Sequence, residues 1–198
     1  MYSTLRTAFA ALLCLAPPAL TAQDLVTNGN FDTGLNSWTF PDASPMWSSF
    51  DMNGSATSGS AFFVNTQAGS YVSQLVLKQC IAIAQTGAYI VGISSYIPSV
   101  QNGSGYLIGG YSMDLHHADC SGGWSAAGGL FMSSQGAWAT YSTTVPSNPV
   151  LNVSIRDPEA SISIELSVDK TTAGGSYGGY FDGAYLIRDT VFLDGFDP

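Results

Sequence analysis

Polar and apolar residues alternate without a break in the segment Ser161-Ile-Ser-Ile-Glu-Leu-Ser-Val-Asp169. Successive side chains of an extended strand point to opposite faces, so the four apolar residues share one face. The serines and Glu165 share the other face. The segment therefore predicts a β-strand that packs one face into a core and exposes the other to solvent.

Further strands are predicted on both sides of this segment by β-branched and aromatic residues between turn dipeptides such as Asn53-Gly54. They lie at Tyr71–Leu77, Ala88–Ile97, Trp138–Val145 and Leu151–Arg156. Ala88–Ile97 is apolar on both faces, which is typical of a central strand. No stretch of a dozen residues shows a helical period with caps. Roughly nine to eleven short strands favour an all-β protein, an antiparallel two-sheet β-sandwich or jelly roll, although the strand order cannot be deduced.

Composition excludes several classes of protein. Only 10% of the 198 residues are charged and 12% are aromatic, which is unlike a disordered chain or a coiled coil. Five Lys and Arg stand against fourteen Asp and Glu, which gives a formal charge of −9. Binding to phosphate backbones requires clustered basic side chains, so nucleic acid is not expected as a partner.

Residues 1–22 resemble a secretory signal peptide. Arg6 precedes an apolar run over residues 8–16, and Thr21-Ala22 offers a cleavage site with small residues. The apolar run is about half as long as a membrane-spanning helix, so no membrane insertion is expected. The sequence predicts a signal peptide (1–22), one domain (23–188) and a C-terminal tail (189–198). The mature protein is expected to be extracellular, periplasmic or on the cell surface.

Cleavage after Ala22 would remove Cys14 and leave Cys80 and Cys120 as the only cysteines. In an oxidising compartment, an even number of cysteines points to a disulfide. Two unpaired buried thiols are the alternative. A zinc site is disfavoured because no second pair of Cys or His ligands has suitable spacing.

Several segments, in order along the chain, resemble the jelly-roll carbohydrate-binding modules of families 4, 9 and 22. The opening segment combines Asn-Gly-x-Phe-Asp with a later Gly and Trp, and the closing segment has the form Tyr-x-Asp. The matching segments are Leu25–Trp38, Ser58–Val64, Ser73-Gln74, Gly87-Ala-Tyr89, Gly136-Ala-Trp138 with Tyr141-Ser142, and Tyr180–Leu186. The resemblance implies a β-sandwich of the galactose-binding type and a carbohydrate ligand.

The same resemblance assigns roles to individual residues. It implies that Trp38 and Trp138 belong to the core, and that Asp32 and Asp182 bind a structural calcium ion together with backbone carbonyls. This chain departs from the family pattern at two of these places. Asp32 stands where a Glu is usual, and Gly183 replaces a second Asp of the closing segment.

Aromatic residues in loops or glycine-rich segments are the candidates for stacking on sugar rings. They are Trp124, Trp47, Tyr106, Tyr111 and Tyr177. Ordinary core packing is the alternative for each, and Trp124 could instead cover the disulfide as a hydrophobic lid. The scarcity of basic groups favours a neutral glycan over an acidic one.

No catalytic constellation emerges, so we predict a non-catalytic protein. The acids at Asp157 and Glu159 lie in an expected turn, and Glu165 and Asp169 lie on the polar face of a strand. The cluster from Asp114 to Asp119 contains two histidines, but a strand would turn its ligands to opposite faces. Besides a secreted carbohydrate-binding module, a structural or adhesive β-sandwich without a sugar ligand remains open, as does a small hydrolase.

Overall fold

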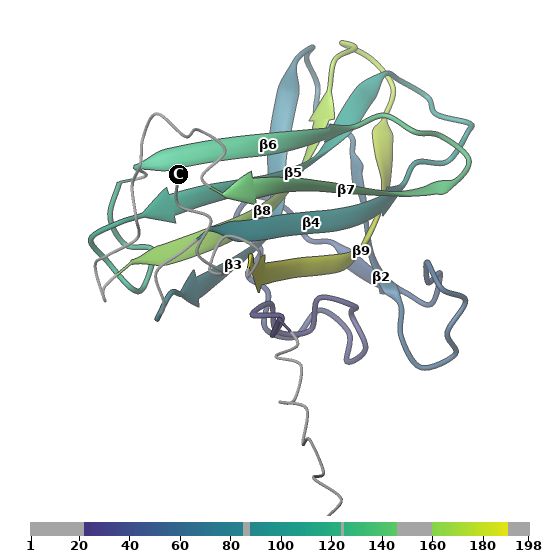
Figure 1. Cartoon of the computed structure of the whole chain (residues 1–198). Helices are drawn as coiled ribbons and strands as arrows, with labels where there is room; N and C mark the ends of the chain where they lie inside the picture. Colours follow the sequence, from purple (N-terminus) through teal and green to yellow (C-terminus); the bar gives the residue numbers. More distant parts are fainter. Residues whose placement is uncertain (1–21, 85–87, 124, 146–159, 190–198) are drawn as a thin grey trace, which may run out of the picture.

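The computed structural model describes residues 22–84, 88–123, 125–145 and 160–189, which form two packed β-sheets (Figure 1). Its strands are β1 (Met46–Ser48), β2 (Ser60–Asn65), β3 (Val72–Ala82), β4 (Tyr89–Tyr96), β5 (Gly105–Asp114), β6 (Ala126–Met132), β7 (Trp138–Val145), β8 (Ser161–Lys170) and β9 (Tyr177–Arg188). The predicted strand at Leu151–Arg156 and the acids Asp157 and Glu159 lie outside the described residues.

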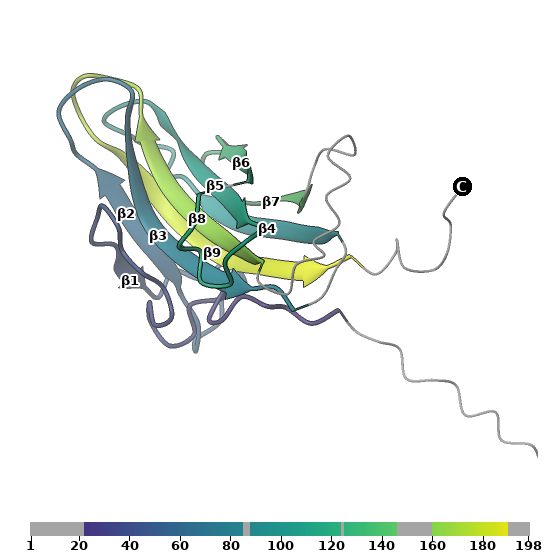
Figure 2. The same cartoon turned by 90° about the vertical axis from the view of Figure 1, so that its left-hand side faces the viewer.

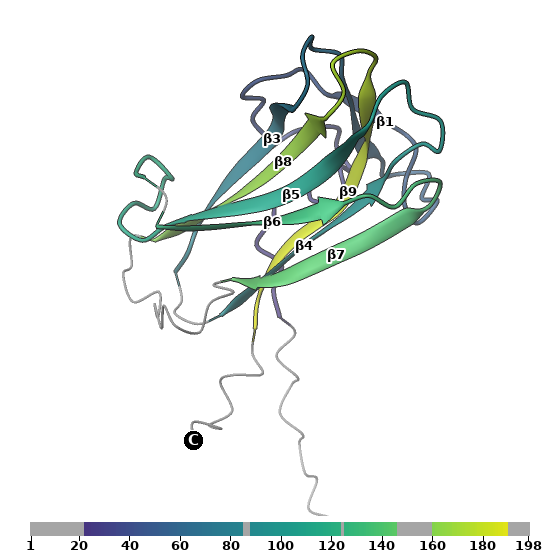
Figure 3. The ribbon, with the colours of Figure 1, turned by 90° about the horizontal axis from the view of Figure 1, so that it is seen from above.

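The five-stranded sheet has the order β1-β2-β9-β4-β7, and the four-stranded sheet has the order β3-β8-β5-β6. All the neighbouring strands in both sheets are antiparallel. Figure 3 shows β3, β8, β5 and β6 side by side, and Figure 2 shows β3, β8 and β9 curving in the same direction. The predicted all-β two-sheet sandwich is thereby confirmed.

The alternation in the segment at 161–169 determines which side chains enter the core. Ile162, Ile164 and Leu166 of β8 are buried between the sheets, and Phe181 and Leu186 of β9 meet them from the opposite sheet. The expected central strand is β4, which lies between β9 and β7. Its position explains why its sequence is apolar on both faces.

The opening segment closes one side of the sandwich by docking on β9. The Ala184 N–H donates to the Gly29 carbonyl at 3.0 Å, and a Cβ on Gly29 would overlap the Ala184 carbonyl oxygen. The Asn28 side chain donates to the carbonyls of Gly34 and Asn36 and so shapes the loop that follows. Trp38 is buried in the core, as the resemblance implied.

Cys80 of β3 and Cys120 form a disulfide, which confirms the prediction of one disulfide bond. It ties the loop after β5 to the outer edge of the four-stranded sheet. The described ends of the chain lie together, because the Leu25 N–H donates to the Leu186 carbonyl at 2.9 Å. No helix with the length and apolar character needed to cross a bilayer occurs in the described part of the chain.

Removal of the disulfide is expected to destabilise the fold. The bond closes a loop with a sequence separation of 40 residues. In the chain-entropy account, such a constraint on the unfolded chain stabilises the folded state by about 4 kcal/mol. The double variant Cys80→Ser/Cys120→Ser should therefore lose about 2–4 kcal/mol of unfolding free energy in urea titrations. An unchanged midpoint and slope would contradict this account.

Candidate functional site

Four aromatic residues lie in one register row across the outer face of the five-stranded sheet. Phe62 of β2 pairs with Tyr180 of β9, which pairs with Tyr96 of β4, which pairs with Trp138 of β7. Their ring centroids are 4.6 Å apart for Phe62 and Tyr180, 6.0 Å for Tyr180 and Tyr96, and 5.8 Å for Tyr96 and Trp138. We call these four residues the aromatic row.

Phe50, from the loop between β1 and β2, lies on the aromatic row. Its ring stacks on Trp138 at 5.4 Å and meets Tyr96 and Tyr180 edge-on at 4.8 and 4.9 Å. The Ser60 hydroxyl donates to the Phe50 carbonyl at 2.6 Å and fixes the backbone there. Phe50 remains 40% exposed. The row and Phe50 together therefore present a half-exposed aromatic surface rather than a closed core.

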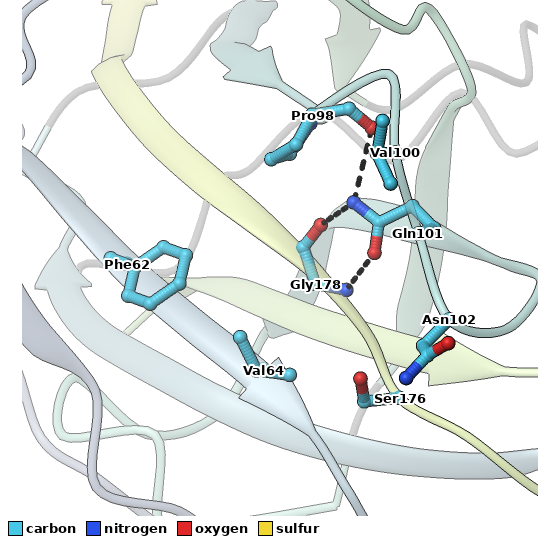
Figure 4. A pocket seen from close by; sticks show the side chains of 8 residues that line it. All are labelled: Phe62, Val64, Pro98, Val100, Gln101, Asn102, Ser176 and Gly178. Atoms are coloured by element: carbon cyan, nitrogen blue, oxygen red, sulfur yellow. Dashed lines mark hydrogen bonds between the residues drawn. The ribbon is translucent and has the colours of Figure 1, made fainter.

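A pocket of about 450 Å³ adjoins the Phe62 end of the row. Phe62 and Val64 form one wall, while Gln101, Asn102 and Ser176 lie across from them (Figure 4). The residues lining this pocket are Phe62, Val64, Pro98, Val100, Gln101, Asn102, Ser176 and Gly178. The site thus combines apolar rings with amide and hydroxyl groups.

The Gln101 side chain holds this wall of the pocket in place. Its Nε2 donates to the carbonyls of Pro98 and Gly178 at 3.2 and 3.0 Å, and its Oε1 accepts from the Gly178 N–H at 3.2 Å. The two bonds with Gly178 tie the β4–β5 loop to β9, and the bond with Pro98 lies within the loop. This wall of the pocket is therefore fixed by hydrogen bonds within the protein itself.

A buried carboxylate lies two residues along β9 from Tyr180 of the row. Asp182 pairs with Ser94, and its oxygens accept from the N–H groups of Met52 at 3.0 Å and Gly183 at 2.6 Å. Burial raises the pKa of Asp182 to about 6, and the charges of Asp51 and Asp32 add to this effect. Gly183 adopts a φ of 55° at the bulge in β9, a conformation that glycine accepts without strain.

Asp51 differs from Asp182 because it accepts more hydrogen bonds. Burial opposes its ionisation, but donation from the Ser58 hydroxyl and the N–H groups of Ser55 and Asn53 outweighs burial and lowers its pKa. Asp51 thus stays ionised and shapes the β1–β2 loop that carries Phe50.

Two of the predicted sugar-contacting residues are wrong for that role. Tyr111 and Tyr177 are only 3% and 1% exposed, because the alternation of β5 and β9 turns their rings into the core. Burial also raises the pKa of Tyr177. Glycine-rich surroundings suggested exposure, but Gly105 and Gly128 lie in strands, and a Cβ at these positions would overlap the rings of Tyr177 and Tyr111.

Trp47 and Tyr106 lie on different sheets. Trp47 is half-exposed in β1, where its indole N–H donates to the Phe31 carbonyl at 2.8 Å and anchors the opening loop. Tyr106 is exposed on the outer face of the four-stranded sheet. Trp124 lies outside the described residues, so its sugar contact stays a prediction.

The position of Trp138 differs from the one that the resemblance implied. The resemblance placed it in the core, but it is half-buried and belongs to the aromatic row. Its indole nitrogen is buried and has no hydrogen-bond partner. The row itself was missed because each ring stands alone in its own strand, and only the register brings the four strands together.

The acidic candidates are dispersed in the structure. Asp182 is buried and Asp32 is exposed, and only the influence of Asp32 on the pKa of Asp182 indicates that they are near each other. The Asp114 carboxylate accepts from the His117 ring at 3.1 Å and from the Gly122 N–H at 2.8 Å. Nowhere in residues 22–84, 88–123, 125–145 and 160–189 do three His, Cys, Asp or Glu side chains gather closely enough to hold a metal ion.

Comparison with known proteins supports the fold. No family model and no curated protein sequence matches the chain. The module TmCBM61, solved in complex with β-1,4-galactotriose, superposes with a TM-score of 0.53 and 17% identity over 84% of this chain and 99% of that one. A putative sugar-binding protein from Bacteroides thetaiotaomicron superposes with a TM-score of 0.54 and 12% identity, over 84% of this chain and 100% of that one. The chain has the jelly-roll β-sandwich fold of carbohydrate-binding modules.

The same fold also occurs within an enzyme. The enzymatically active domain of tailspike protein 4 from bacteriophage CBA120 gives a TM-score of 0.56 and 14% identity over 84% of this chain. The match covers only 21% of that chain. Fold similarity therefore does not decide between a binding module and part of an enzyme, and the function has to be argued from the site.

The raised pKa of Asp182 predicts a pH dependence of stability. The pKa of Asp182 is about 6 in the folded protein and about 3.9 in the unfolded chain. Between these two pH values the folded protein therefore binds more protons than the unfolded chain does. Without divalent cations, its contribution to stability should increase by about 1 kcal/mol from pH 7 to pH 5. Denaturant titrations at both pH values, compared with Asp182→Asn, isolate this group from the histidines. Equal pH responses of the two proteins would contradict the assignment.

Proposed function

We propose that the mature chain is a secreted, non-catalytic carbohydrate-binding module for a neutral glycan, with the outer face of the five-stranded sheet as its binding surface. The observation that carries this proposal is the aromatic row with Phe50 above it and a polar-walled pocket at its end. Sugar rings have apolar faces that stack on aromatic side chains, and their hydroxyls bond to amides and hydroxyls.

The lining of the pocket favours a neutral ligand. None of the residues that line it is Lys or Arg, whereas an acidic glycan would call for a basic partner. Elsewhere, Lys78 pairs with Glu165 at 3.1 Å, and the Lys170 ammonium is buried and donates to the carbonyls of Gly69 and Thr172. Binding to uncharged sugars through stacking is weak, so we expect dissociation constants between about 1 μM and 1 mM.

The non-catalytic part of the proposal rests on the surroundings of the acids. Glycoside hydrolysis needs two carboxyls about 5–10 Å apart that both reach the substrate. Asp182 and Asp51 are near the row, but both are buried, and their oxygens accept hydrogen bonds from the β1–β2 loop and from Gly183. Glu165 lies on the other sheet.

Secretion is supported by two independent features. The first is the leader-like sequence of residues 1–22, and the second is the Cys80–Cys120 disulfide, a bond that persists in oxidising compartments. The fold shared with modules such as TmCBM61 is consistent with an extracellular role.

Phe50 supports an alternative function. Because it covers part of the row, the rings could serve only to hold the β1–β2 loop in a structural or adhesive β-sandwich without a sugar ligand. The two functions differ in their response to substitution. Replacing Phe62, at the open end of the row, should impair binding in the first case and only stability in the second.

The binding function is tested with Phe62→Ala and Phe50→Ala. A glycan array and pull-down on insoluble polysaccharides identify the ligand of the mature protein. Loss of one stacked ring should weaken binding about tenfold or more, which corresponds to about 1.4 kcal/mol. Tyr71→Ala is the control, because this ring is 84% exposed and lies outside the row. A wild-type protein that retains no polysaccharide would sink the proposal and favour the structural alternative.

We also propose that calcium binds near Asp182, as the family resemblance implied. Support comes from the negative charges of Asp51 and Asp32 near Asp182, which add to the effect of burial in raising the pKa of Asp182. Bound calcium would neutralise this charge and draw its remaining ligands from backbone carbonyls, since it takes six to eight oxygens. Against it stands the occupation of both Asp182 oxygens by N–H donors.

Calcium binding predicts a change in melting temperature. Millimolar calcium added to chelator-treated protein at pH 7.5 should raise the melting temperature by several degrees, because the ion binds only the folded state. Asp182→Asn and Asp32→Asn should each remove the increase, whereas Asp119→Asn, in the loop after β5, should keep it. An identical melting temperature with calcium and with chelator rules the site out.

A further inference from the structure

The outer face of the four-stranded sheet carries a second pair of exposed rings. Tyr106 of β5 and Phe131 of β6 are 42% and 66% exposed, and they meet edge to face at 6.2 Å. Large apolar rings exposed together on a sheet cost free energy unless a partner covers them. The pair lies on the sheet opposite to the aromatic row.

Next to the rings, the surface of the sheet is hollow. Gly110 of β5 and Gly129 of β6 are register partners, and neither bears a side chain. A Cβ built on Gly129 would come no closer than 3.5 Å to any neighbour, an ordinary contact with Ile108. Space for a side chain therefore exists here, but the sequence leaves it empty.

Beyond the two glycines lies a polar pocket of about 280 Å³. Its lining includes Ser112, Asp114, Ser163 and Glu165, together with Lys78. The Glu165 carboxylate accepts from the Ser112 hydroxyl at 3.0 Å and from Lys78 at 3.1 Å.

The Ser163 hydroxyl is the most informative group in this pocket. Ser163 is only 1% exposed, lines the pocket and has no hydrogen-bond partner for its Oγ. Buried polar groups are nearly always bonded, so this hydroxyl calls for a partner that enters the pocket.

We propose that this outer face is a second carbohydrate-binding surface, which stacks sugar rings on Tyr106 and Phe131 and receives sugar hydroxyls in the pocket around Ser163. The proposal rests on the proposed function, because it assigns the same ligand class to a second surface. Tyr106 and Ser112 are six residues apart on β5, which spans about 20 Å and fits a chain of several sugar units.

The chemistry of the pocket favours a hydroxyl-rich neutral ligand over an anion. It contains two carboxylates and one ammonium, and that ammonium is already paired with Glu165. Donation from the His116 N–H, the His117 ring and the Gly122 N–H lowers the pKa of Asp114, so this group stays an acceptor. A purely apolar partner would cover the rings but leave Ser163 without a bond.

Because the two surfaces lie on opposite faces of the sandwich, one protein would bind two glycan chains. Such a protein cross-links polysaccharides, whereas a protein with one surface only coats them. Cross-linking is therefore the property that distinguishes a protein with both surfaces from a protein with only one.

The experiment uses the mature protein in affinity gels and turbidity assays with soluble β-1,4-galactan, xylan and mixed-linkage β-glucan. Gly129→Val fills the hollow, and Ser163→Ala removes a hydroxyl without breaking any hydrogen bond of the folded protein. Each should reduce retardation in the gel at least threefold and abolish turbidity, with an unchanged melting temperature. Ser70→Val, in the exposed loop between β2 and β3 and outside the lining of both pockets, is the control for adding a β-branched residue and should behave as wild type.

Combination with Phe62→Ala separates the two proposals. If Gly129→Val and Ser163→Ala bind and cross-link as wild type while Phe62→Ala abolishes retardation, the second surface is overturned and the proposed function stands. If Phe62→Ala has no effect and Gly129→Val abolishes retardation, the second surface stands and the site on the five-stranded sheet is overturned. Wild-type protein that none of the three polysaccharides retards overturns both.

Discussion

Contact between the inner faces of the two sheets is the constraint on which the rest of the structure depends. Phe181 of β9 and Leu166 of β8 are fully buried where the sheets meet. Because side chains alternate along a strand, burying Phe181 directs its neighbour Tyr180 outward, and burying Ile164 does the same for Ser163 and Glu165. The core thus selects which side chains each outer face can offer to a ligand.

The ends of the domain depend on the same strand β9. The close approach of Gly29 to Ala184 leaves no room for a side chain, so the Asn-Gly pair of the opening segment has a packing role. Two residues before Ala184 on β9, Asp182 accepts a hydrogen bond from the Met52 N–H and thereby holds the β1–β2 loop against the outer face. The same strand therefore fixes the opening segment and the loop that carries Phe50.

The alternation of polar and apolar residues, together with the turn residues, was sufficient to predict the sandwich. The predicted strand Trp138–Val145 has the same first and last residues as β7 in the structure. The expected oxidising compartment and the even number of cysteines in the mature chain were sufficient to predict the disulfide. The aromatic row was not predictable, because Phe62 and Tyr180 are distant in sequence and only strand order makes them neighbours. The exposure predicted for Tyr111 and Tyr177 was wrong for a related reason, because a glycine-rich segment can be either a loop or a closely packed strand.

The small share of charged residues in the chain can be related to the groups on the two outer faces. The outward positions of β8 are occupied by serines and two acids, and the row on the other sheet adjoins amide and hydroxyl groups. Neutral sugars need acceptors and donors of this kind close to aromatic rings, and surplus Lys or Arg would add charge without a partner. The composition that argued against nucleic acid at the outset therefore follows from surfaces built from rings, hydroxyls and amides.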